Sequence, residues 1–133
     1  MDRVFLDANV LFSAAYKADA RVGRLWQLGD VVLCTSRYAI EEARSNLEEG
    51  EQLRRLDELT KSLRLFDNFE SKLPRGVDLA DKDVPILLAA IEAKADYLLT
   101  GDLRHFGPLI GKRTAGVIVM LPGKYLKRRQ GDE

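Results

Sequence analysis

The chain has 133 residues, of which 46% are hydrophobic and 32% are charged, with 21 basic and 21 acidic side chains balancing to a net charge of zero. This length and composition fit one globular domain with its own core. The balanced charge argues against a protein that holds nucleic acid by bulk charge alone, and no apolar run is long enough to span a bilayer.

The start of the chain and its cysteine content indicate a cellular compartment. The chain begins directly with an expected strand, without the pattern of a secretion signal. Its one cysteine, Cys34, excludes an intrachain disulfide and lies in an apolar run, as a small buried side chain does. We therefore expect a cytoplasmic protein that is not associated with a membrane.

Strand and helix patterns alternate in the N-terminal half of the chain. The apolar run 3–6 predicts a buried strand, and apolar residues at helical spacing predict helices at 9–17 and 18–28. The run 30–35 predicts the next strand. The following segment, 36–47, predicts a helix that has a serine in the N-cap position.

The same alternation continues in the C-terminal half. The leucine spacing over 51–63 predicts an amphipathic helix, and part of 63–69 predicts a strand. After a polar loop at 70–83, the segment 84–95 is apolar on most faces and predicts a buried helix with Pro85 in its first turn. Two last strands are expected at 96–100 and 116–121. The basic run 124–130 is interpreted as part of a solvated tail.

Strands that alternate with helices predict an α/β domain whose parallel sheet is covered on both faces. We place this domain at residues 1–126 and a basic, polar tail at 127–133. In such folds, sites form beyond the carboxyl ends of the strands. Asp7 ends the first strand and Asp102 follows the strand at 96–100, so both are expected at this edge.

Two further acidic residues are expected near the same edge. Asp83 stands at the start of the buried helix, where the helix dipole favours an anion, although a plain N-cap would also account for it. Glu42 lies beside the apolar stripe of the helix at 36–47. The adjacent Glu41 lies on the charged face of that helix, so Glu42 is the candidate site residue.

Four carboxylates held close together would repel one another, and a divalent cation removes that repulsion. Oxygen ligands without a cluster of Cys and His favour Mg²⁺ or Mn²⁺ over Zn²⁺. Such an ion polarises a phosphoryl oxygen and lowers the pKa of bound water. Asn9 and Thr100, each two residues from a candidate ligand, are expected to add neutral oxygens or to orient a carboxylate.

The order and context of these acidic residues resemble those of the PIN-domain nucleases. The resemblance runs from Val4 to about Leu126 and rests on "LDANVL" (6–11), on D-x-x-I-L-x-A-A starting at residue 83 and on "ADYLLTGDLRHF" (95–106). It implies a three-layer α/β/α fold with a five-stranded parallel sheet and metal-dependent endonuclease activity, usually on RNA. The family's acidic and small polar positions map onto Asp7, Glu42, Asp83, Asp102, Asn9 and Thr100, with Asp83 preferred over Asp81 for its spacing to the apolar helix.

The resemblance also implies partners. Many small single-domain members of this family are VapC-like toxins that pair with an antitoxin and form homodimers. Most of the large apolar residues in the first two helices are expected in the core, while an exposed subset would form a dimer seam or an antitoxin groove. These residues are Leu11, Phe12, Tyr16, Leu25 and Trp26.

Three basic side chains lie beside the candidate ligands and are candidate RNA contacts: Lys82, Arg104 and His105. For Lys82 and Arg104, simple solvation is an equally good interpretation. For His105, the only histidine in the chain, we favour a polar surface or capping role over a contact with a phosphate or carboxylate.

Other functions fit the sequence less well. A catalytically silent PIN-like module that binds RNA or protein is the main alternative, and intact acidic residues at all four positions argue against it. Phosphoryl transfer through an aspartyl-phosphate often uses a second acid two residues after the first, where this chain has Asn9. A dinucleotide-binding domain is disfavoured because no G-x-G-x-x-G follows the first strand.

Overall fold

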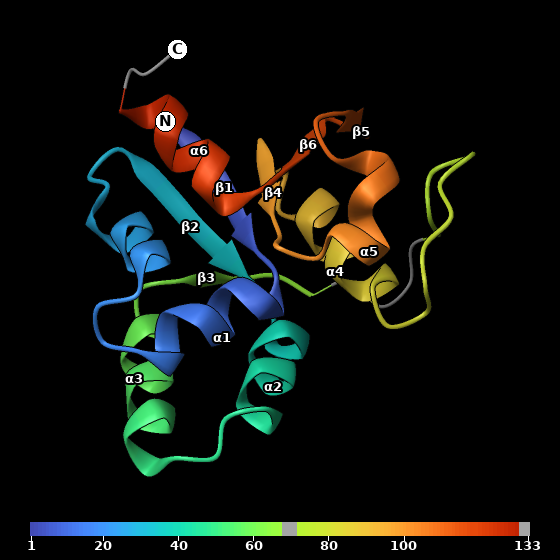
Figure 1. Ribbon diagram of the computed structural model, residues 1–133. Coiled ribbons are helices and arrows are strands. Elements are labelled where there is room, and N and C mark those ends of the chain that lie inside the picture. The colour runs from blue at the N-terminus through green and yellow to red at the C-terminus, as the bar shows by residue number, and fades with distance from the viewer. Residues whose placement is uncertain (68–71, 131–133) are drawn as a thin grey trace.

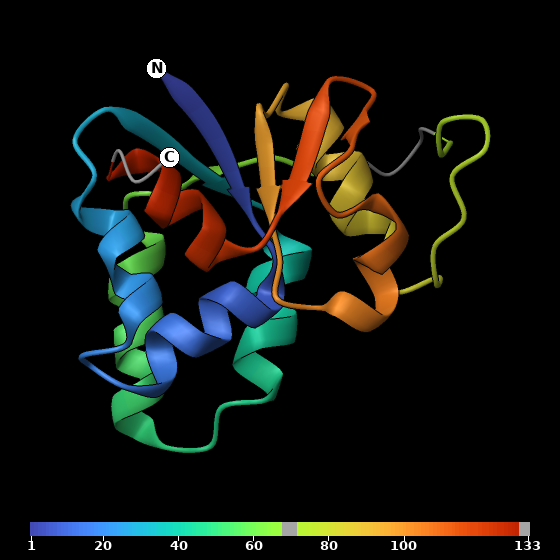
Figure 2. The same ribbon diagram turned by 45° about the horizontal axis from the view of Figure 1, so that its top comes forward.

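The computed structural model describes residues 1–67 and 72–130, which are arranged around a central six-stranded sheet (Figures 1 and 2). The strands follow the spatial order β3-β2-β1-β4-β6-β5. Their bounds are β1 (Asp2–Leu6), β2 (Val31–Thr35), β3 (Arg64–Leu65), β4 (Tyr97–Leu99), β5 (Arg113–Thr114) and β6 (Val117–Met120).

The five predicted strands are present and run parallel to one another, in the order β3-β2-β1-β4-β6. The prediction of a five-stranded, fully parallel sheet nevertheless missed one strand. The short β5 adds a sixth strand, which pairs antiparallel with β6. Ala115 and Gly116 join these two strands and both have positive φ, as a tight hairpin turn requires. Two residues are too few for a strand period, so the sequence pattern missed β5. Part of the strand expected within 63–69 lies outside the described residues.

The helices match most of the sequence expectations. The segments predicted at 9–17, 36–47, 51–63 and 84–95 form α1 (Ala8–Tyr16), α2 (Arg37–Ser45), α3 (Gly50–Thr60) and α4 (Val84–Glu92). The Ser36 hydroxyl accepts a hydrogen bond from the backbone N–H of Ala39, which is the expected N-cap of α2. The remaining elements are α5 (Leu103–Phe106), α6 (Pro122–Arg129) and the 3₁₀ segments η1 (Arg21–Gln27) and η2 (Gly107–Leu109).

The prediction of an α-helix at 18–28 is wrong, because this segment forms the 3₁₀ segment η1. Gly23 lies in its interior, where glycine disfavours helix, and Ala20 at its start offers no side-chain cap. The apolar residues are still used for packing. Leu25 is fully buried, and the indole N–H of Trp26 donates to the carbonyl of Leu59 at 2.8 Å.

The helices cover both faces of the sheet, which confirms the expected three-layer α/β/α fold. The chain moves from β1 to β2 in one direction along the sheet and from β3 back to β4 in the other. Right-handed connections therefore place η1 and α4 on opposite faces. α6 contacts η1, whereas α4 contacts β2 and β4, and the two ribbon views show α4 and α6 on either side of the sheet (Figures 1 and 2).

The core surrounds the two central strands, and it ends at one polar edge. Phe5, Leu6, Leu98 and Leu99 are fully buried, and residues 86–90 of α4 are all buried, which explains why that helix is apolar on most faces. The hydrogen-bond ladder continues one residue past the strands. The Asp7 N–H donates to the Leu99 carbonyl at 3.1 Å and the Thr100 N–H to the Met120 carbonyl at 3.1 Å. Asp7 and Thr100 therefore lie level at the carboxyl ends of β1 and β4.

The interpretation of 124–130 as a solvated tail is wrong, because residues 122–129 form the packed helix α6. Tyr125 and Leu126 are buried, and the Tyr125 hydroxyl donates to Asp2 Oδ2 at 2.8 Å. Arg129 forms ion pairs with Asp2 and Asp30. The basic residues of this short helix hid its two apolar anchors from the sequence pattern. Residues 131–133 of the expected tail lie outside the described part of the chain.

We expect Tyr125→Ala to destabilise the protein by roughly 3–5 kcal/mol, because it removes a fully buried aromatic ring and leaves a cavity. Urea unfolding of the purified protein measures the change. Lys127→Ala, on the exposed side of the same helix, is the matched control and should be neutral within about 0.5 kcal/mol. Equal stability of the two variants would contradict the packing of α6.

Candidate functional site

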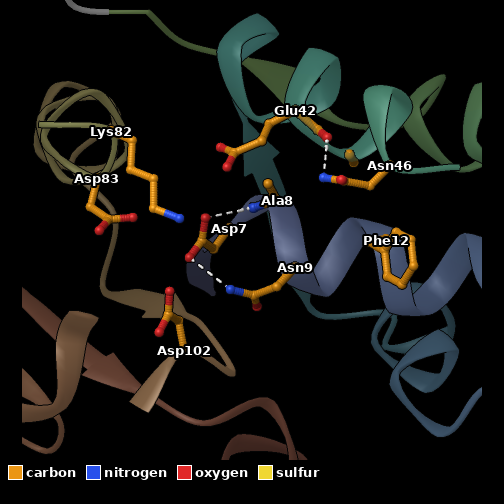
Figure 3. Close-up of a pocket in the computed structure, with 10 residues that line it drawn as sticks. Asp7, Ala8, Asn9, Phe12, Glu42, Asn46, Lys82, Asp83 and Asp102 are labelled. Carbon is orange, nitrogen blue, oxygen red and sulfur yellow. Dashed lines mark hydrogen bonds between the residues drawn. The ribbon is translucent and has the colours of Figure 1, made fainter. Parts of the chain in front are cut away.

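An open cavity of about 380 Å³ lies where β1 and β4 end, and all four predicted acidic residues line it (Figure 3). Asp7 follows β1, Glu42 lies on α2, Asp83 precedes α4 and Asp102 precedes α5. The chain leaves β1 toward β2 but leaves β4 toward β6, so the cavity lies where the strand order reverses. The remaining lining residues are Ala8, Asn9, Phe12, Ala43, Asn46 and Lys82.

Asp7 is almost completely buried and is held by three donors. Its Oδ1 accepts from the Ala8 N–H at 2.6 Å, and its Oδ2 accepts from the Thr100 hydroxyl at 2.8 Å and from the Asn9 side-chain amide at 3.1 Å. Asn9 is fixed in turn, because its Oδ1 accepts from the Gly101 N–H at 2.8 Å. Asn9 and Thr100 therefore orient this carboxylate, one of the two possibilities that the sequence suggested.

Thr100 connects the two strand ends. It is fully buried, and its Oγ1 donates to Asp7 while accepting from the Asp102 N–H at 3.0 Å and the Asn9 amide at 3.2 Å. One hydroxyl thus fixes the side chain that follows β1 and the backbone that follows β4. The T-G-D segment places Asp102 relative to Asp7 through this hydroxyl.

Burial and neighbouring acidic residues both raise the pKa of Asp7. Burial raises the pKa of Asp7 to about 6, against the lowering effect of the hydrogen bonds from Thr100 and Ala8. The charges of Asp83 and Glu42 raise this pKa further. Burial is therefore the main reason that the pKa of Asp7 stays above its ordinary value although three donors hold the carboxylate, and the neighbouring acidic charges add to it.

Asp83 occupies the N-cap position of α4, but its side chain makes no capping hydrogen bond. The plain N-cap interpretation therefore does not account for it. Its Oδ2 is enclosed and has no hydrogen-bond partner among the described residues. Burial raises the pKa of Asp83, the charges of His105 and Lys82 lower it, and Asp102 raises it. Asp81, the other candidate in this segment, is exposed and does not line the cavity.

Asp102 is bound at both carboxylate oxygens by His105. Its Oδ1 accepts from the His105 backbone N–H at 3.0 Å, and its Oδ2 lies 2.7 Å from the ring Nδ1. Burial alone would raise the pKa of Asp102, but these contacts outweigh burial and hold that pKa below its ordinary value. The favoured surface or capping role for the His105 side chain is wrong, since the ring contacts a carboxylate of the site.

Glu42 faces the cavity and Glu41 faces solvent, as the helical phase predicted. The Glu42 side chain extends from α2 into the cavity (Figure 3). The Glu41 side chain is 74% exposed and lies 3.9 Å from Arg44 on the same helix. Tyr38 ties α2 to the opposite wall, because its hydroxyl donates to the Lys82 carbonyl at 2.7 Å.

Of the basic candidates Lys82 and Arg104, only Lys82 lines the cavity. Lys82 lines the cavity, and its side chain extends toward Asp7 from the wall that carries Asp83 (Figure 3). Arg104 is exposed and does not line the cavity.

Phe12 and Asn46 were not identified from the sequence as residues that line the cavity. Helical spacing was the available signal, because Phe12 lies one turn after Asn9 and Asn46 one turn after Glu42.

The donor set fits a hard divalent cation. The cavity offers carboxylate oxygens from four elements, an enclosed Asp83 oxygen with no hydrogen-bond partner in the described chain, and an Asp7 whose pKa is raised. Ligand atoms of Asp83, Asp102 and His105 lie within 4.8 Å of one another. Oxygen-rich sites of this kind suit Mg²⁺ or Mn²⁺.

Comparison with known proteins places the chain in a family. It belongs to the PIN domain family, whose model matches residues 3–104. No curated protein matches the chain. In the described part of the chain, no helix is long and apolar enough to cross a membrane.

Two solved structures show the same fold. VapBC2 from Rickettsia felis, bound to a DNA fragment from its promoter, aligns at a TM-score of 0.62 and 20% identity, over 88% of this chain and 96% of that one. VapBC-1 from nontypeable Haemophilus influenzae aligns at a TM-score of 0.59 and 14% identity, over 91% and 98%.

The raised pKa of Asp7 predicts a pH-dependent effect of Asp7→Asn on the metal-free protein. The folded-state pKa lies above the ordinary value, so the folded state binds more protons, and Asp7 destabilises the fold increasingly as pH rises from about 4 to 6. In EDTA, the stability of Asp7→Asn relative to wild type should therefore improve by roughly 2–3 kcal/mol between about pH 4 and pH 7.5.

Urea unfolding at the two pH values measures this difference. Asp81→Asn is the control, because Asp81 is exposed and should show little such change. A difference between wild type and Asp7→Asn that stays constant over this range would contradict a carboxylate whose pKa burial raises.

Proposed function

We propose that this protein is an Mg²⁺- or Mn²⁺-dependent endoribonuclease that hydrolyses RNA phosphodiester bonds and acts in the cytoplasm as the toxin of a toxin–antitoxin pair. One observation carries the nuclease proposal. Four carboxylates from four separate elements line one cavity at the sheet edge of a PIN domain. A bound cation gives a physical reason to collect this charge, and within the described residues Asp83 Oδ2 makes no hydrogen bond, with His105 Nδ1 at 3.2 Å as a near neighbour.

The four acidic residues would hold the cation, and the chain's other residues prepare them for it. A bound Mg²⁺ or Mn²⁺ supplies Lewis-acid activation of a phosphate and lowers the pKa of bound water. Thr100 and Asn9 fix the Asp7 carboxylate in one orientation, so it needs little rearrangement on binding. Lys82, on the cavity wall, would attract a phosphate that the acidic side chains alone would repel.

Space for RNA continues beyond the acidic cavity. A second cavity, of about 600 Å³, shares Asn9 and Asp102 with the first, and Lys124 is among its lining residues. Its walls are mostly apolar and include Val10, Val22, Leu121 and Pro122. A strand that ran through both cavities would meet Lys82 in the first and Lys124 in the second. Arg104, exposed on α5 beside Asp102, remains a proposed RNA contact.

The antitoxin and the homodimer are the partner proposals. Both structural neighbours are VapBC complexes, which supports a protein partner for this chain. Phe12 lines the acidic cavity, and its ring packs against Tyr16 at a centroid distance of 5.4 Å. Tyr16 is 51% exposed, so an aromatic strip on α1 leads from the cavity to the surface. An antitoxin segment would cover this strip, while Leu11 and Leu25 belong to the core.

A cleavage assay on a mixture of structured and single-stranded RNAs tests the enzymatic proposal. Wild type should cleave with Mg²⁺ or Mn²⁺ and not with EDTA, and Asp102→Asn should lower the rate at least about 100-fold, because it removes a charged ligand. Circular dichroism and urea unfolding check that the variant is folded. RNA binding by wild type without metal-dependent cleavage would instead support a catalytically silent binding module.

Glu42→Gln and Glu41→Gln form a matched pair on one helix. We expect Glu42→Gln to lower the metal-dependent cleavage rate by about 10–1,000-fold, since its carboxylate lies in the cavity. Glu41→Gln should leave the rate within about twofold, because that side chain is exposed and only lies near Arg44. The same RNA and metal titration is applied to both proteins. Equal losses, or no loss in either, would contradict the assignment of Glu42.

A further inference from the structure

We propose that His105, which is not among the lining residues of the acidic cavity, is a positioning residue that holds Asp83 and Asp102 together through its Nδ1 atom. This inference rests on the proposed metal-dependent function, since its consequence is the affinity of those two carboxylates for a cation. From the sequence, contact with a phosphate or a carboxylate was the less favoured interpretation of His105, and a surface or capping role was the favoured one. The positioning role differs from that of a direct metal ligand.

The contacts of the His105 ring single out one nitrogen. Nδ1 lies 2.7 Å from Asp102 Oδ2, in a hydrogen bond, and 3.2 Å from Asp83 Oδ2. One carboxylate oxygen of each aspartate therefore faces the same ring nitrogen. To donate to Asp102, Nδ1 must carry a proton, which fixes the ring's donor on the side that faces both acids.

His105 is the group that joins two otherwise separate elements at this point. Asp102 belongs to the β4–α5 connection, whereas Asp83 begins α4. In the described residues, Asp83 Oδ2 is enclosed without a hydrogen bond, and His105 Nδ1 lies 3.2 Å from it. Without the ring, two carboxylates whose oxygens lie within 4.8 Å of each other would repel at this edge.

The position of the ring supports an indirect role. His105 does not line the acidic cavity, although Asp83 and Asp102 do. The next residue, Phe106, is fully buried and anchors α5 to the core, and the His105 backbone N–H donates to Asp102 Oδ1 at 3.0 Å. The ring is thus held in contact with both carboxylates. Partners that orient metal-binding carboxylates typically change metal affinity by about 10–100-fold when removed.

Two amide substitutions test the role of Nδ1. The side-chain nitrogen of His105→Asn falls near the Nδ1 position, whereas that of His105→Gln lies one methylene further out. We expect His105→Asn to bind Mn²⁺ within about threefold of wild type in calorimetric titration. His105→Gln and His105→Ala should bind about 10–100-fold more weakly. If these proteins cleave RNA, saturating Mn²⁺ should restore most of the lost rate.

The outcomes separate this role from the proposed function. Wild type that binds no Mn²⁺ contradicts both the metal-dependent function and the role of His105. Wild type that binds Mn²⁺ while all three variants bind equally well contradicts the positioning role alone. Equal weakening in all three variants, including His105→Asn, also contradicts it, because the position of the donor would then not matter.

Nitrogen NMR provides a readout that is independent of activity and of stability. His105 is the only histidine, so long-range ¹H–¹⁵N spectra contain one imidazole and need no assignment by mutation. We expect Nδ1 to carry a proton in the metal-free protein and to keep it when Mg²⁺, which is diamagnetic, is added. Loss of the Nδ1 proton on Mg²⁺ addition would show direct coordination and would overturn the positioning role.

Discussion

The burial of the Asp7 carboxylate at the centre of the sheet edge is the constraint on which the rest of the site depends. A charge that is taken out of water needs donors, and the donors here come from the residue that follows it, from the first turn of α1 and from the end of β4. Thr100 contributes most to the geometry, because the same hydroxyl also accepts from the backbone of Asp102. Satisfying one carboxylate therefore sets the register of β1 against β4 and the exit path of the chain after β4.

The donors that hold Asp7 do not neutralise the whole cluster. Asp7 and Asp83 have raised pKa values, with burial as the first cause, whereas the pKa of Asp102 is lowered by its contacts with His105. The metal-free fold thus carries unfavourable electrostatic energy at Asp7 and Asp83, although His105 lies close to Asp83. Sites that perform chemistry often store energy in this way, and the surrounding structure compensates for it. Here the compensation comes from the apolar packing of β1, β4 and α4.

The sequence pattern of a single helix or strand was sufficient to predict those site residues whose position depends on that element alone. Helical phase alone separated Glu42 from Glu41, and the end of an apolar run located Asp7 and Asp102. Other features depend on how elements meet and leave no local pattern. His105 contacts Asp83, although α4 and β4 lie between these two residues in the sequence. The short spacing from His105 to Asp102 therefore revealed only one of the two carboxylates near the His105 ring. α6 was hidden because two buried residues, Tyr125 and Leu126, lie in a strongly basic segment.

The distribution of the acidic residues over four elements has a thermodynamic consequence. The unfolded chain keeps Asp7, Glu42, Asp83 and Asp102 far apart, so a cation that needs several of them binds only the folded state. Such binding stabilises the fold in proportion to the logarithm of the metal concentration over its dissociation constant. The same ion that activates a phosphate would then relieve the repulsion that burial creates among the carboxylates. If the proposed cation binds in this cavity, the stability of this edge of the sheet would therefore depend on the same ion as the proposed chemistry.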